Sequence, residues 1–251
     1  MIVDTHIHLY DERYQEILFE VIEEALANEV RKMIIVGYDK KSSIEAVKMA
    51  QEFDFFYAAV GLHPSDVKKE KDLDLTWLHD LLQEPKVVAI GEIGLDYYWD
   101  KSYKVLQIEF FKKQIEIARE AKLPLIVHSR DAALDTYTVL KEKPLPGVLH
   151  CFPYSVEMAE KFVELGYYLG IGGVLTFKNS RILKEVVKEI DLKYLLSETD
   201  GPYLTPAPFR GKLNRPAYLK YIIEGIAEIK KIDSGTVKNV LYQNARDLFK
   251  F

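Results

Sequence analysis

The sequence contains a single cysteine, Cys151, among its 251 residues. One cysteine cannot form an internal disulfide, so we expect a protein of the reducing cytoplasm and interpret Cys151 as a buried side chain rather than a nucleophile. The sequence also has no apolar run of the roughly 18 residues that a membrane-spanning helix needs. The first residues, MIVDTHIHLY, lack the basic and apolar regions of a secretory signal. Nothing in the chain therefore predicts a membrane partner.

An excess of positive charge is also missing, because the formal net charge is −5. Global electrostatics therefore do not indicate nucleic-acid binding. One segment is different: no acidic residue occurs between Gly201 and Ile223, which contains Arg210, Lys212, Arg215 and Lys220. Its position directly after Asp200 favours a rim that faces anions.

A glycine-rich phosphate loop does not follow the first predicted strand, which argues against a dinucleotide-binding fold. Instead, short apolar runs alternate with amphipathic stretches along the chain, as in parallel α/β proteins. We predict one (β/α)₈ TIM barrel spanning residues 1–251 as a single domain. Its eight strands are expected at Ile2–His6, Lys32–Val36, Phe55–Val60, Val87–Gly91, Leu125–His128, Val148–His150, Tyr167–Ile171 and Tyr194–Ser197.

Histidines and carboxylates occur at the ends of several of these strands. His6 and His8 are two residues apart, so they share one face of a strand, and Asp4 has the same parity. Two imidazoles on one face can bind the same divalent metal, with Asp4 as a supporting residue. Glu92 follows the apolar run VVAIG, where an uncompensated charge would be costly. Its two oxygens could bridge two cations.

Three further strand ends complete the pattern. His128 and His150 end consecutive strands, and Asp200 follows the eighth. Four imidazoles and two carboxylates exceed what a single tetrahedral zinc site uses. They suit two divalent cations about 3.5–4 Å apart, which hold the attacking and leaving oxygens of a displacement. Ligand chemistry favours zinc or manganese, with magnesium usable.

The remaining histidines are interpreted differently. His63, in GLHP, faces the same mouth of the barrel and is expected to contact the substrate or its leaving group. His79 is expected on the surface of a helix, without a function.

Six motifs together resemble the TatD-type deoxyribonucleases of the amidohydrolase-like metal-dependent hydrolases. They are DTHIH, GLHP, GEIGLDYY, LPLIVHSRDA, GVLHCF and SETDGPYLTPAPFRGKLNRP, in the order and spacing of that family over essentially the whole chain. The resemblance implies a (β/α)₈ barrel and a metal-dependent nuclease acting 3′→5′ on single-stranded DNA or RNA. The matching positions imply metal ligands at His6, His8, Glu92, His128, His150 and Asp200, and Asp200 would also assist the attacking water.

For the substrate, Arg130 and Arg210 are predicted to hold phosphate together with His63, since a guanidinium suits phosphate oxygens. Exposed rings at the mouth could stack unpaired bases; the candidates are Tyr97, Tyr98, Trp99, Phe152, Tyr154, Tyr203 and Phe209. We expect more than half of these rings to be packed under the rim loops instead. The predicted protein is a monomer or weak oligomer. The alternative function is hydrolysis of an amide or ester at the same site, such as D-aminoacyl-tRNA deacylation.

Overall fold

The strands of the computed structural model, which describes residues 1–69 and 74–251, form one parallel sheet in sequence order. Within these residues the sheet has eight strands, as the sequence predicts. They are β1 (Ile2–Ile7), β2 (Val30–Val36), β3 (Phe56–Val60), β4 (Val87–Asp96), β5 (Leu125–Arg130), β6 (Gly147–Leu149), β7 (Tyr167–Ile171) and β8 (Leu195–Ser197).

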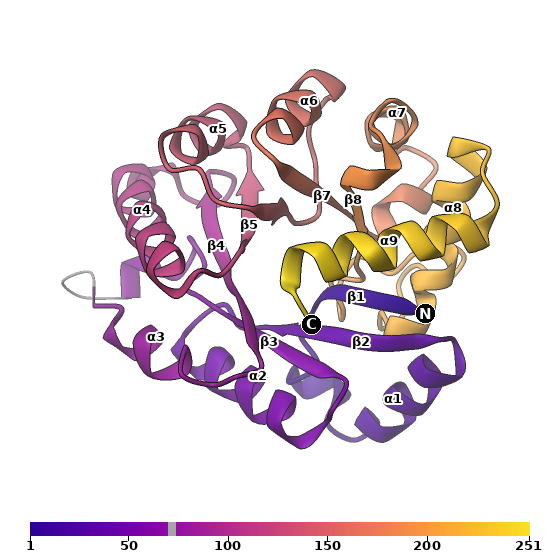
Figure 1. The fold of residues 1–251 in the computed structure, drawn as a ribbon, viewed down its shortest axis with the longest axis horizontal. Coiled ribbons are helices and arrows are strands. Elements are labelled where there is room, and N and C mark those ends of the chain that lie inside the picture. The colour runs from indigo at the N-terminus through magenta and orange to yellow at the C-terminus, as the bar shows by residue number, and fades with distance from the viewer. Residues whose placement is uncertain (70–73) are drawn as a thin grey trace.

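Helices follow the strands and surround them (Figure 1). They are α1 (Leu18–Ala27), α2 (Lys40–Glu52), α3 (Thr76–Leu81), α4 (Lys104–Ala121), α5 (Ala133–Glu142), α6 (Val156–Glu164), α7 (Arg181–Glu189), α8 (Leu219–Lys230) and α9 (Ser234–Phe249). None of the helices among the described residues is long and apolar enough to cross a membrane.

The sheet curls until its first and last strands meet. Ser197 Oγ donates to the carbonyl oxygen of Val3, and Ile7 forms a parallel bridge with Gly201. This closure gives a TIM barrel, and it brings the carboxyl ends of β1 and β8 together.

Alternation along the strands divides the core in two. Ile34 and Val36 of β2 point into the barrel, whereas Met33 and Ile35 pack outward against the helices. Leu248 and Phe249 of α9 also pack against this interior cluster. In Figure 1 this helix crosses the barrel in yellow and carries the C-terminus to its centre. The amino-terminal end of the barrel is therefore filled, and the opposite end is left for a functional site.

Strand β4 is longer than predicted. The sequence analysis ended it at Gly91, but pairing with β5 resumes after an irregularity and runs from Ile93 to Asp96. Glu92 and Asp96 therefore belong to a strand and not to a loop. The sequence analysis did not predict this extension because glycine and acidic residues are rare in strands. Pairing with β5 is what makes these residues part of the strand.

Candidate metal centre

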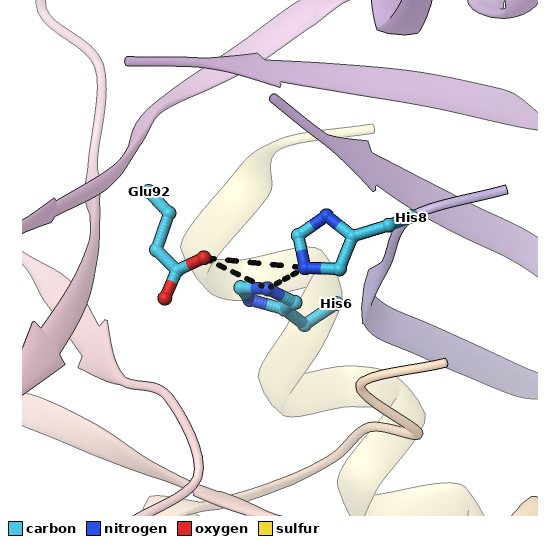
Figure 2. Close-up of side chains that lie close together, drawn as sticks. All are labelled: His6, His8 and Glu92. Carbon is cyan, nitrogen blue, oxygen red and sulfur yellow. Dashed lines mark hydrogen bonds and ion pairs between the residues drawn. The ribbon is translucent and has the colours of Figure 1, made fainter. Parts of the chain in front are cut away.

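Side chains from opposite sides of the barrel meet at its carboxyl-terminal mouth. His6 lies in β1, His8 directly follows it and Glu92 lies in β4. Figure 2 shows the two imidazoles pointing toward each other, with Nε2 atoms 3.3 Å apart, and the Glu92 carboxylate beside them. Glu92 Oε2 lies 3.6 Å from Nε2 of His6 and 4.0 Å from Nε2 of His8. These three donors are close enough to contact one cation.

Asp200 joins this group from the end of β8. Its backbone N–H donates to the carbonyl oxygen of His6 at 2.9 Å, which fixes the residue against β1. Its Oδ1 lies 3.6 Å from Nε2 of His8 and 3.8 Å from Nε2 of His6. Closure of the barrel thus brings together residues that are far apart in the sequence.

The second oxygen of Glu92 faces a different set of imidazoles. Oε1 lies 2.9 Å from Nδ1 of His128 and 3.3 Å from Nε2 of His150. It is also 3.6 Å from Nε2 of His63, whose ring contacts that of His128. The two carboxylate oxygens of Glu92 therefore face two adjacent groups of imidazoles. His63 lies closer to the centre than a residue that only grips the substrate would require.

Neighbouring acceptors orient the imidazoles. His8 uses Nδ1 to donate to the carbonyl oxygen of Val36 at 2.7 Å, which leaves Nε2 free as a ligand. Nε2 of His128 lies 3.2 Å from Oδ2 of Asp96, so its Nδ1 faces Glu92. Asp96 therefore acts as a supporting acceptor for the imidazole of His128.

Glu198 supports His150 from below. It is fully buried, accepts the backbone N–H of Cys151 at 2.5 Å and places Oε1 3.3 Å from Nδ1 of His150. Asp4 behaves differently from its prediction. Its carboxylate accepts the backbone N–H of Thr199 at 2.9 Å and the Thr199 hydroxyl at 2.5 Å, so it supports the turn before Asp200 instead of an imidazole side chain.

The electrostatics of the cluster are set by burial and by the mutual contacts of these groups. Burial favours a raised pKa for Glu92, but the imidazoles of His150, His63 and His128 outweigh it and hold that pKa well below its usual range. Burial and the neighbouring His128 lower the pKa of His63 to about 4. Glu92 is thus an anion at neutral pH, and His63 is a neutral imidazole.

The donor set fits divalent metal ions. Imidazole nitrogens and carboxylate oxygens are the usual ligands of zinc and manganese. They converge here in a buried cluster where Nε2 of His6 and Nε2 of His8 lie 3.3 Å apart and face the carboxylates of Glu92 and Asp200, and where Oε2 of Glu198 has no hydrogen-bond partner. A cation would compensate buried groups that otherwise repel or lack partners. The chemistry available at such a site is metal-assisted hydrolysis.

Asn214 is a residue that the sequence analysis missed. Its buried Nδ2 donates to the carbonyl oxygens of Thr199 at 2.8 Å and Tyr203 at 2.6 Å, and its own carbonyl accepts the hydroxyl of Tyr14 at 2.6 Å. It therefore fixes the loop that carries Asp200. No local pattern marks Asn214, since the folding of its own loop and the approach of Tyr14 bring its partners to it.

A cavity of about 730 Å³ opens beside the centre, and His128, His150 and Asp200 contribute to its wall. Arg130 also lines this cavity. Arg210 is exposed in the loop after β8 and stacks on Phe177, with its guanidinium 3.8 Å from the ring centre. His79 is exposed in α3, in agreement with its prediction.

Arg215 differs from the sequence-based expectation. It was grouped with the basic residues facing anions, but its Nη1 contacts Glu20 at 2.7 Å and Glu24 at 2.9 Å. Its charge is compensated by α1. The sequence could not reveal this pairing because the partners are nearly two hundred positions apart.

Most of the candidate aromatic residues at the mouth are packed. Tyr97 and Phe152 are buried, Tyr154 contacts the Ser129 hydroxyl at 2.8 Å, and Phe209 stacks on Tyr218. The exposed rings are those of Tyr98, Trp99 and Tyr203. The expectation that more than half would be packing residues is confirmed.

Comparison with known proteins gives a consistent result. A family model described as TatD related DNase matches residues 3–250. The metal-dependent hydrolase YabD of Bacillus subtilis is 47% identical over 253 residues, covering 100% of this chain and 99% of YabD. The metal-dependent hydrolase YcfH of Escherichia coli is 36% identical, covering 99% of this chain and 95% of YcfH. The crystal structure of YJJV, a TatD homologue from E. coli, superposes with a TM-score of 0.95 at 30% identity, covering 100% of this chain and 98% of YJJV.

Proposed function

Because the chain belongs to the TatD-related DNase family of metal-dependent hydrolases, we propose that it hydrolyses phosphodiester bonds of DNA, acting from the 3′ end of single strands. The observation that carries this proposal is the position of Glu92. One of its oxygens faces His6 and His8, and the other faces His128 and His150. This arrangement suits two cations at adjacent sites.

In this proposal His6, His8, Glu92 and Asp200 hold one divalent cation, and Glu92, His128 and His150 hold the other. Zinc, manganese or magnesium would make an attacking water acidic and neutralise charge on a phosphoryl oxygen. Glu92 fixes the spacing of the two sites. Asp200 orients the water and accepts its proton, since its carboxylate lies at the mouth and contributes to the cavity wall.

Contacts with the substrate would come from three cationic or polar groups. Arg130 lines the cavity, and Arg210 extends from the loop that follows Asp200. Neither guanidinium has an ion-pair partner among the described residues, so both can bind phosphate. His63, whose ring contacts His128 and whose Nε2 faces Glu92, would contact the scissile phosphate or the leaving oxygen. The proposal includes a cytoplasmic protein that is a monomer or a weak oligomer.

The test is product analysis on a 3′-labelled single strand and the matching duplex, with Mn²⁺, with Mg²⁺ and with EDTA. We expect metal-dependent release of mononucleotides from the 3′ end, faster from the single strand. Glu92→Ala and Asp200→Asn should lose activity by about 10²–10⁴-fold and stay folded, whereas His79→Ala should match the wild type. Full metal-dependent activity in folded Glu92→Ala would overturn the ligand assignment. If the protein is inactive on both DNAs but hydrolyses a misacylated tRNA, the proposed nuclease activity is wrong and the deacylase activity takes its place.

A further inference from the structure

Two exposed aromatic side chains and an arginine form a cluster on the loop after β4. Tyr98 is 54% exposed and Trp99 is 73% exposed, and their rings meet edge to face with centres 4.8 Å apart. The guanidinium carbon of Arg130 lies 3.7 Å from the Tyr98 ring centre and 5.6 Å from that of Trp99. Tyr98, Trp99 and Arg130 are called the Trp99 platform below. It presents a free aromatic face and an unpaired positive charge side by side.

The platform is connected to the metal centre through Asp96. One oxygen of this carboxylate accepts the backbone N–H of Tyr98 at 2.9 Å, and the other lies 3.2 Å from Nε2 of His128. Strand pairing places Asp96 opposite Arg130 and Gly94 opposite His128. Arg130 is therefore two residues beyond His128 on the same strand, about 7 Å farther out. That distance is comparable to one nucleotide step of an extended strand.

The backbone that carries the platform is held in place before any ligand binds. The side chain of Gln107 accepts the backbone N–H of Asp96 and donates to its carbonyl oxygen, both at 2.9 Å. Tyr97 N–H donates to the carbonyl oxygen of Arg130 at 2.9 Å, and the Tyr97 hydroxyl donates to Asp135 at 2.9 Å. Little ordering of this backbone is then needed when a ligand binds, which favours affinity.

The charges around Trp99 are compatible with an anionic ligand. Arg130 has no ion-pair partner within residues 1–69 and 74–251, and it also lines the cavity beside the centre. Two carboxylates lie close to the platform in the sequence: Asp96 is bonded to the Tyr98 N–H and lies beside His128, and Oδ1 of Asp100 accepts both the backbone N–H of Ser102 at 2.9 Å and its hydroxyl at 2.6 Å. One oxygen of each carboxylate is thus already bonded to the protein backbone.

We propose that the Trp99 platform binds an unpaired nucleobase of the strand whose phosphodiester bond lies at the metal centre. The base would stack on Trp99, and Arg130 would contact the phosphate next to it. A base inside a duplex has both faces covered by its neighbours, so only an unpaired base can use this surface. The proposal rests on the proposed function, and it supplies a physical reason for a preference for single strands.

The two tryptophans of the chain allow a direct test. Trp77 is only 6% exposed in α3, so Trp99 should account for any fluorescence change caused by a ligand. The titrant is a deoxythymidylate strand of about 12 nucleotides, a length typical of single-strand sites, added in EDTA to prevent cleavage. We expect quenching in the wild type and in Trp77→Phe, and none in Trp99→Phe.

Affinity is measured by anisotropy of the labelled strand. Trp99→Ala should raise Kd by about 5- to 150-fold, the range of base–aromatic stacking, and Trp99→Phe should restore most of the affinity. The matched control is Phe19→Ala in α1, since Phe19 has the same exposed fraction, 73%, and packs against Phe53. A strand of the same length made of abasic sites should bind wild type and Trp99→Ala equally.

The outcomes separate this inference from the proposed function. The platform is overturned if Trp99→Ala weakens binding of the thymidylate strand and of the abasic strand equally, or if it leaves the Kd for the thymidylate strand unchanged. Either result would count even if the wild type degrades DNA with Mn²⁺. In cleavage assays the platform predicts a higher KM for Trp99→Ala with kcat nearly unchanged. A wild-type protein that neither binds nor cleaves the strand overturns the proposed function and the platform together.

Discussion

Glu198 occupies the space into which a side chain at Gly170 would project. An ideal Cβ on Gly170, in β7, would lie 2.4 Å from Oε2 and 2.8 Å from Oε1 of Glu198. Real Cβ atoms do not approach other atoms this closely, so the absence of a side chain at position 170 lets Glu198 reach the underside of His150. The requirement for glycine here comes from close approach, since Gly170 does not have a positive φ.

Gly170→Ala should therefore displace Glu198 and loosen His150. Since partners that orient a metal-ligating histidine typically contribute 10–100-fold in metal affinity, we expect a loss of about that size. Thermal unfolding should also occur at lower temperature, because overpacking costs about 1–3 kcal/mol. Titration calorimetry with Mn²⁺ or Zn²⁺ and a melting curve measure the two effects.

The matched control for this substitution is Gly172→Ala, two residues farther along the chain. A Cβ there would lie 3.6 Å from the nearest atom, the carbonyl oxygen of Glu198, which is an ordinary contact. Its metal affinity and unfolding temperature should stay near those of the wild type. Equal losses in both variants would show that the region tolerates no side chain, and that Glu198 is not the cause.

Removal of metal should destabilise the protein. A ligand at 100 times its Kd stabilises the folded state by about 2.7 kcal/mol, which corresponds to a melting shift of about 5–10 °C for a chain of this size. We expect that shift on adding EDTA, with recovery after Mn²⁺ is restored in excess. Glu92→Gln should lose most of the response because the carboxylate facing both histidine pairs is gone, and His79→Ala should keep it. A Glu92→Gln protein that responds fully would contradict the arrangement.

Asn214→Ala should reduce stability and activity together. The substitution leaves the carbonyl oxygens of Thr199 and Tyr203 without their amide donor, and Asn214 is buried. Leaving a buried polar group unsatisfied costs about 1–3 kcal/mol. Urea unfolding measures this loss, and kcat reports the displacement of Asp200. A variant with lowered stability but unchanged kcat would indicate that the loop keeps Asp200 in place without Asn214.

Arg210 and Arg215 should differ in their effect on DNA binding. Arg210 has no carboxylate partner among the described residues, whereas Arg215 is paired with Glu20 and Glu24. Arg210→Ala should reduce the slope of log affinity against log salt by about 1, the effect of losing one phosphate contact. Arg215→Ala should leave the slope unchanged. The measurement is anisotropy of a labelled DNA strand in EDTA at several salt concentrations. If Arg215→Ala reduced the slope and Arg210→Ala did not, the phosphate contact would be assigned to Arg215.

The sequence alone predicts the barrel and most of the residues at its mouth. Apolar runs such as Leu125–His128 mark strands because buried parallel strands are nearly all apolar. Histidines at their ends gather at one edge because parallel strands share a direction. The pairing of His6 with His8 follows from the two-residue repeat of a strand. The distance between their Nε2 atoms, 3.3 Å, and Figure 2 agree with it.

Only the tertiary structure reveals which groups contact each other across the barrel. Glu92 meets His6 and His128 with different oxygens, Glu198 supports His150, and Arg215 is paired with α1. These pairs join distant parts of the chain, so no local pattern contains them. Exposure is decided in the same way, because neighbours cover Tyr97 and leave Trp99 open. The sequence by itself determined the fold and the kinds of ligand available, whereas closure of the barrel decided their partners, because distances between strands depend on the packing of the whole sheet.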